Sequence, residues 1–82
     1  MSANLPAALV QAATELGLVR GRAWHGAVWW ARPGSDRAMA FLGDDGVWRW
    51  APEGCPIGHQ QRCGSEQEAL ERAVAWLRGG GR

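Results

Sequence analysis

Residues 37–51 read RAMAFLGDDGVWRWA, and this stretch decides the fold. Its central Gly-Asp-Asp-Gly, at 43–46, has the composition of a tight turn. The turn separates two short segments, 37–42 and 47–51, that are typical of strands. Short extended segments joined by such a turn indicate an antiparallel hairpin.

A third strand is predicted at residues 27–32, ahead of the turn sequence Pro-Gly-Ser-Asp at 33–36. An earlier start at Arg22, with Gly26 as a β-bulge, also fits the pattern. The three strands are expected to form an antiparallel meander. Residues 52–64 are rich in Pro, Gly and Gln and are interpreted as a loop.

A helix is expected on either side of the meander. The first spans about residues 4–16, with Asn4 as its N-cap and Gly17 as its stop. The second begins at the capping box Ser-Glu-Gln-Glu of residues 65–68 and ends at a run of glycines. The fold class is therefore predicted as α+β in the order α-β-β-β-α, a three-stranded antiparallel meander with two helices packed on one face.

Six tryptophans in 82 residues must be divided between the two faces of this sheet. Side chains alternate along a strand, so Trp48 and Trp50 share a face and Arg49 points the other way. We expect Trp48 and Trp50 to pack against the helices and Arg49 to lie outside. Trp29 and Trp30 are adjacent, so one of them must lie on the open face, and the alternation does not say which.

The second strand adds side chains to this open face. If Ala38 and Ala40 are small in order to fit beneath the helices, then Met39 and Phe41 point outward. Aromatic, Met and Arg residues together are the composition of a protein interface core, and aromatics with flanking arginines also hold single-stranded nucleic acid. The predicted binding residues are Trp29, Trp30, Met39, Phe41, Arg37 and Arg49.

Composition and charge narrow the class of protein. The formal net charge is +1 and all nine basic residues are arginine, so no strong field favours nucleic acid or anionic lipid as a partner. No apolar run approaches the roughly 20 residues that span a membrane, and no signal-peptide pattern opens the chain. We expect a single cytoplasmic α+β domain over residues 1–82, with a frayed tail at about 79–82, from a bacterium or its phage.

Cys55, His59 and Cys63 are spaced four residues apart in the predicted loop. Zinc sites use such residues but need four ligands, so His25 or a carboxylate would have to complete the set. Two free thiols are the favoured interpretation, because disulfides are rare in a reducing cytosol. A Cys-His nucleophile would also need an orienting group and an oxyanion donor, and the sequence gives no sign of either. We therefore expect no metal, no cofactor and no enzymatic activity.

The order helix, three strands, helix is similar to that of double-stranded-RNA-binding domains. Where that family has a phosphate-gripping lysine cluster, residues 65–68 read Ser-Glu-Gln-Glu, and residues 32–36 have no counterpart of its histidine-bearing loop. Three strands followed by a helix that begins Ser-Glu-Gln-Glu-Ala also looks like the arm-binding domains of phage integrases. Both likenesses concern the order of the elements, and neither carries a functional residue across.

The predicted function is that of a small binding or regulatory protein that recognises a protein partner through its open sheet face. An accessory or inhibitor protein of a phage or mobile element is a setting that suits it. The second hypothesis is a nucleic-acid-binding module, with Arg32, Arg37 and Arg49 at phosphates. The third is a homodimer whose open faces bury each other. Trp24 and Trp76 are expected to pack in the core or at its rim.

Overall fold

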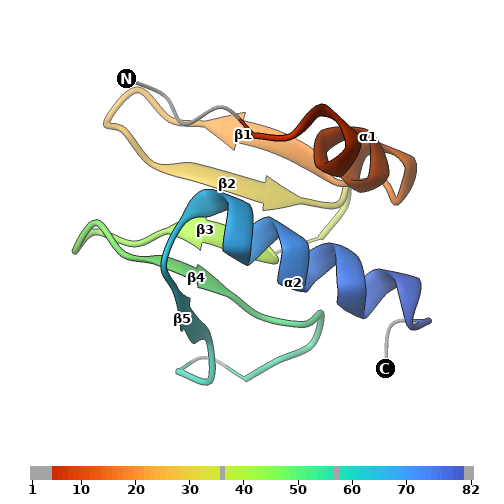
Figure 1. The fold of residues 1–82 in the computed structure, drawn as a ribbon. Coiled ribbons are helices and arrows are strands. Elements are labelled where there is room, and N and C mark those ends of the chain that lie inside the picture. The colour runs from red at the N-terminus through yellow and green to blue at the C-terminus, as the bar shows by residue number, and fades with distance from the viewer. Residues whose placement is uncertain (1–4, 36, 57, 81–82) are drawn as a thin grey trace.

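The computed structural model describes residues 5–35, 37–56 and 58–80. Five strands in this part of the chain form one antiparallel sheet in the order β1-β2-β3-β4-β5, and a helix precedes and follows them (Figure 1). The predicted α+β class is confirmed. In chain order the elements are α1 (Ala7–Glu15), β1 (Val19–Arg22), β2 (Val28–Ala31), β3 (Ala40–Leu42), β4 (Trp48–Trp50), β5 (Gln61–Cys63) and α2 (Glu66–Arg78).

The prediction of three strands was wrong, because each edge of the sheet carries one strand more. Gly26 is not a bulge but part of the turn between β1 and β2, where its φ is +97°. The Ala23 N–H donates to the Ala27 carbonyl at 2.8 Å and closes this hairpin. At the other edge, β5 lies in the segment interpreted as a loop. The five-stranded sheet also departs from the three-stranded order on which the two family resemblances rested.

The first helix ends as expected and begins later than expected. Pro6 is its N-terminal cap residue, and the predicted cap Asn4 lies outside the described residues. At the other end Gly17 has a φ of +90°, and its N–H donates to the Thr14 carbonyl at 3.0 Å. The next N–H, of Leu18, donates to the Ala13 carbonyl at 2.9 Å. This pair of bonds is the Schellman motif, in which a glycine reverses the chain at the end of a helix.

The N-terminus of α2 forms half of the predicted capping box. The Ser65 hydroxyl accepts the Glu68 backbone N–H at 3.2 Å, as expected. The Glu68 carboxylate accepts the N–H of Gly64, at 3.4 Å, rather than that of Ser65. The two bonds pair the N–H groups of Glu68 and Gly64, which no carbonyl of the helix can accept, and they fix where α2 starts.

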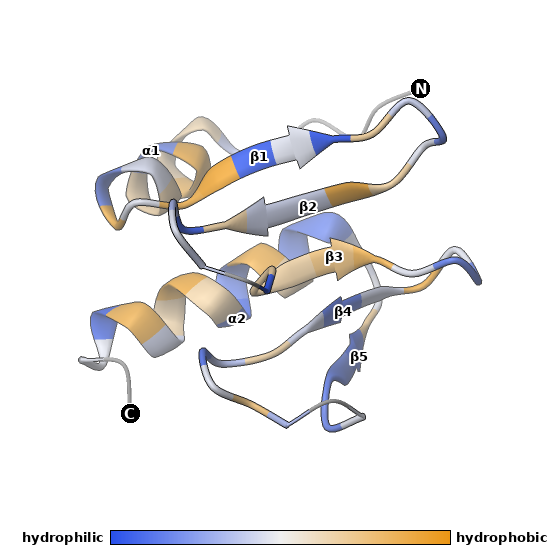
Figure 2. Cartoon of the chain, turned by 180° about the vertical axis from the view of Figure 1, so that it is seen from behind, coloured by the Kyte–Doolittle hydropathy of each residue, from blue (hydrophilic) through white to orange (hydrophobic). Residues whose placement is uncertain are grey.

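The two helices form a layer on one face of the sheet. Helix α2 lies across β3, β4 and β5, and α1 packs beside it (Figure 1). The view from behind shows the opposite face of the sheet with no helix over it (Figure 2). We call this second face the open face. None of the helices in the described ranges is long and apolar enough to cross a membrane.

Small side chains let the two layers approach closely. Four of the six buried core residues on the helices are alanines, and the larger core side chains come from both layers. Trp48, Trp50 and Trp76 are partly buried against this core, as predicted. The buried core comprises Ala12, Ala13, Leu18, Trp30, Met39, Ala40, Cys63, Ala69, Leu70, Ala73 and Val74.

Two of the predicted side-chain positions were wrong. Met39 is 1% exposed and belongs to the core, although alternation from Phe41 predicted it to point outward. The alternation fails because β3 begins only at Ala40, so Met39 lies before the regular strand. Trp24 is 98% exposed in the turn between β1 and β2, where packing at the core or its rim was predicted.

Candidate functional site

Strand register brings one side chain from each strand into a row across the open face. Gly21 pairs with Trp29, Trp29 with Phe41, Phe41 with Arg49, and Arg49 with Arg62. Cross-strand partners share a face, so these five residues lie side by side from one edge of the sheet to the other. We call them the open-face row. Three predicted binding residues, Trp29, Phe41 and Arg49, are members of it.

Two members of the row lie down along the sheet because glycines leave room for them. A Cβ atom placed on Gly21 would stand 2.2 Å from Cε2 of the Trp29 ring, so the indole covers the bare backbone of Gly21. In the same way, a Cβ on Gly43 would stand 2.4 Å from an Nη atom of Arg49. Aromatic rings commonly cover strand glycines in this manner. The Trp29 and Arg49 side chains therefore lie close to the backbone of the sheet, with Phe41 between them in the row.

The edge of this surface is apolar around β1. Val19 is 58% exposed, and it pairs with Ala31 on the same face as the row. Together with Trp29 and Pro33 these residues line a shallow depression beside the row. The apolar part of the open face therefore extends from Phe41 to the β1 edge.

The arginines of the open face are largely neutralised by carboxylates of the same chain. Arg49 holds Asp45 through two bonds, of 3.0 and 2.8 Å, and these bonds keep the pKa of Asp45 well below its usual range. Arg32 donates to Glu53 at 2.8 Å. Arg62 ends the row and is exposed. Within the ranges that the structure describes, Arg62 forms no ion pair.

A buried carboxylate decides which of the two adjacent tryptophans faces inward. The indole N–H of Trp30 donates to Glu66 at 2.8 Å, and Arg20 donates to the same carboxylate at 2.9 and 3.3 Å. Glu66 is 7% exposed. Burial raises the pKa of Glu66, but the bonds from Arg20 and Trp30 outweigh burial and leave it below its ordinary value. Trp30 is therefore a core residue, and Trp29 is the one on the open face.

Sequence reasoning missed Glu66, since it was assigned only to the capping box. A signal was present: a buried indole N–H needs an acceptor, and Glu66 is an acid at the edge of the apolar stripe of α2. The bond joins residues 36 positions apart, so it could be inferred only once the helix had been placed over the second strand.

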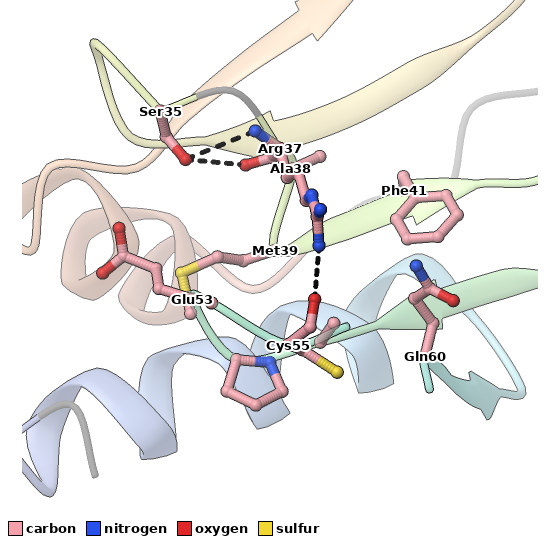
Figure 3. Close-up of a pocket in the computed structure, with 11 residues that line it drawn as sticks. Ser35, Arg37, Ala38, Met39, Phe41, Glu53, Cys55 and Gln60 are labelled. Carbon is pink, nitrogen blue, oxygen red and sulfur yellow. Dashed lines mark hydrogen bonds between the residues drawn. The ribbon is translucent and has the colours of Figure 1, made fainter. Parts of the chain in front are cut away.

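A pocket of about 600 Å³ opens between the turn that precedes β3 and the segment after β4. Met39 and Phe41 line its apolar side, with Ala51 and Pro52 from the opposite segment. Arg37 reaches across and donates to the Cys55 carbonyl, with Met39 to one side and Phe41 to the other (Figure 3). Of the predicted binding residues, Met39 and Arg37 thus belong to this pocket, and Phe41 belongs to both the pocket and the row.

The cysteines and histidines are not brought together. Cys55 is half-buried at the pocket, whereas Cys63 is buried under α2, where burial raises the pKa of its thiol. His59 is exposed, and His25 lies against Trp24 at the far hairpin, with ring centroids 5.5 Å apart. Among the described residues, no three His, Cys, Asp or Glu side chains gather as a metal site would require.

The distinguishing features of the chain are therefore the open-face row, the pocket beside it and the exposed Trp24. Comparison with protein-family models, with curated proteins and with solved structures finds no match to this chain.

Proposed function

We propose that this chain is a small non-enzymatic binding protein that recognises a protein partner through the open face of its sheet. Trp29, Phe41 and Arg49 act as the anchors. By occupying a surface of the partner, the protein blocks that surface or retains the partner. The observation that supports this proposal is the open-face row, which brings aromatic and arginine side chains together on the sheet face that neither α1 nor α2 covers. Trp and Arg are enriched among the few residues that dominate the binding energy of protein interfaces.

The charges on this face favour a protein over a nucleic acid. Of the three arginines predicted to contact phosphates, Arg32 and Arg49 are already paired with carboxylates. A phosphate backbone would have to displace those carboxylates or lie close to them. The affinity of a protein for nucleic acid depends mainly on unpaired cations, which displace counterions from the phosphates. A protein surface can instead pack on the aromatic rings and contact Arg49 together with its partner Asp45.

A binding role also agrees with the roles of the two acids whose pKa is lowered, Glu66 and Asp45. Glu66 is held by Arg20 and Trp30 inside the core, and Asp45 is held by Arg49. In both cases hydrogen bonds lower the pKa and keep the acid ionised, so each acts as a structural anion. General acid–base catalysis needs a group whose pKa lies near the working pH.

Sedimentation of the purified chain tests the proposal against its two alternatives. We expect a monomer at micromolar concentration that does not bind single-stranded or duplex oligonucleotides at low or moderate salt. A complex with an oligonucleotide that weakens steeply with salt would favour the nucleic-acid hypothesis. A stable dimer that is lost in Arg62→Glu would favour the homodimer, because Arg62 is an exposed member of the row.

A further inference from the structure

The pocket beside the row is built like a site for a small ligand rather than for a flat protein surface. Its volume of about 600 Å³ is within the range of small-molecule sites, roughly 300–1,000 Å³. Met39 and Ala51 are almost entirely buried, so its apolar wall is firmly packed. Phe41, on the same side, offers a half-buried aromatic ring.

Arg37 is the one cationic side chain among the described residues that line this pocket, and its position is fixed by hydrogen bonds. The guanidinium of Arg37 donates to the Cys55 carbonyl on the opposite side (Figure 3). The backbone of Arg37 is fixed as well, because the Ser35 hydroxyl accepts its N–H at 3.4 Å and donates to its carbonyl at 3.0 Å. A guanidinium has five N–H donors, so the bond to Cys55 leaves others that can bind a ligand.

The charge of this cation is not cancelled by the acid that lines the same pocket. Glu53 belongs to the lining, but Arg32 pairs with it at 2.8 Å. No ion pair of Arg37 occurs among residues 5–35, 37–56 and 58–80. The pocket therefore combines an apolar wall with a positively charged donor, which is the complement of an apolar anion.

We propose that this pocket binds a small carboxylic acid with a flat apolar body. The body packs against the partly exposed Ala38, Phe41 and Pro52, which lie over the buried Met39 and Ala51. The carboxylate accepts charge-assisted hydrogen bonds from Arg37. The inference does not rest on the proposed protein partner: Phe41 belongs to both sites, but Trp29, Arg49 and Arg62 take no part in the pocket.

The sole phenylalanine of the chain makes a direct test possible. Replacing it with 4-fluorophenylalanine gives one ¹⁹F resonance, from position 41, in the wall of the pocket. The labelled protein is titrated with phenylacetate and, separately, with phenethylamine, which carries a similar ring and the opposite charge. We expect a saturable shift with phenylacetate and affinity weaker by about tenfold or more for phenethylamine, the effect of one charged hydrogen bond.

Variants then assign the effect to the cation. Arg37→Gln should weaken phenylacetate binding by about tenfold, and Arg22→Gln, at an exposed arginine outside the pocket, should leave it unchanged. The methyl signal of Met39, observed in unfluorinated protein, checks that the label itself does not create the site. Equal shifts with both compounds, or no saturable shift with phenylacetate, would overturn the proposal and leave the open-face proposal untouched.

Discussion

At the scale of single residues, a hydrogen bond to Glu66 accompanies the burial of Trp30 rather than Trp29. The alternation of side chains shows from sequence that Trp29 and Trp30 lie on opposite faces, and that Trp48 and Trp50 share one. It could not show that Trp30 is the buried one, because that depends on the bond from its N–H to Glu66, which belongs to a helix far along the chain. The exposure of Trp24 could not be predicted either. Trp24 lies in the turn between β1 and β2, and β1 has no apolar alternation by which that hairpin could be recognised.

A matched pair of substitutions measures this polar contribution. Trp30→Phe removes an N–H that donates to the buried Glu66, whereas the N–H of Trp50 is buried without a partner among the described residues. Both changes remove the same ring atoms, but Trp30 is buried and Trp50 only partly buried. The lost bond and the greater loss of apolar burial therefore act together, and we expect Trp30→Phe to reduce the free energy of unfolding by about 1–3 kcal/mol more than Trp50→Phe. Urea denaturation measures both losses. Equal losses would contradict the structural role given to the Trp30–Glu66 bond.

The same carboxylate gives the fold a dependence on pH. Because the pKa of folded Glu66 lies below its ordinary value of 4.5, its contribution is fully present above that value. The free energy of unfolding should therefore fall as the pH drops below about 4.5, and Asp45 adds to the same trend at still lower pH. Urea denaturation between pH 7 and pH 3 should show a shallower decline in Glu66→Gln. An identical decline in both proteins would refute this assignment.

At the scale of elements, the two strands that sequence reasoning missed are the two edges of the sheet. β1 reads Val-Arg-Gly-Arg and β5 reads Gln-Arg-Cys, so neither shows the apolar alternation that identified β3 and β4. Charged side chains are common at sheet edges because they discourage pairing with other chains. The charged side chains that protect an edge strand from pairing with other chains therefore also make the strand hard to recognise in the sequence. Helix α2, with a capping box and an apolar stripe, was predictable.

The contact between β1 and β2 on the open face gives a prediction for a single glycine. Gly21→Ala should destabilise the fold by about 1–3 kcal/mol, because the new methyl group overlaps the Trp29 ring. Gly79→Ala is the control, since its Cβ would meet other atoms only at 3.5 Å and its φ is −77°. Denaturation gives the stabilities, and the ¹⁹F signal of labelled Phe41 reports whether the neighbouring indole has moved. Unchanged stability and signal in Gly21→Ala would mean that Trp29 does not cover Gly21.

At the scale of the whole molecule, the two described helices form a layer on one face of the sheet, and neither of them covers the other face. Sequence reasoning predicted this arrangement and three of the row's five members, because alternation and helix patterning are local properties. The pocket could not be predicted, since its walls come from the turn before β3 and the segment after β4, which meet only in the folded chain. Met39 is likewise buried only when the turn before β3 and the segment after β4 come together in the folded chain.

The most direct test of the central claim compares two tryptophans of the same chain as anchors for a protein partner. The native protein, Trp29→Ser, Arg62→Glu and Trp24→Ser are immobilised, after circular dichroism has shown each to be folded, and proteins from the cells that produce the chain are passed over them. We predict that a partner held by the native protein and by Trp24→Ser is lost from Trp29→Ser and weakened on Arg62→Glu. Trp24 is the stringent control, because it is far more exposed than Trp29 but lies outside the row. Retention of the partner by Trp29→Ser and Arg62→Glu, or its loss only from Trp24→Ser, would contradict the claim that the open face is the binding surface.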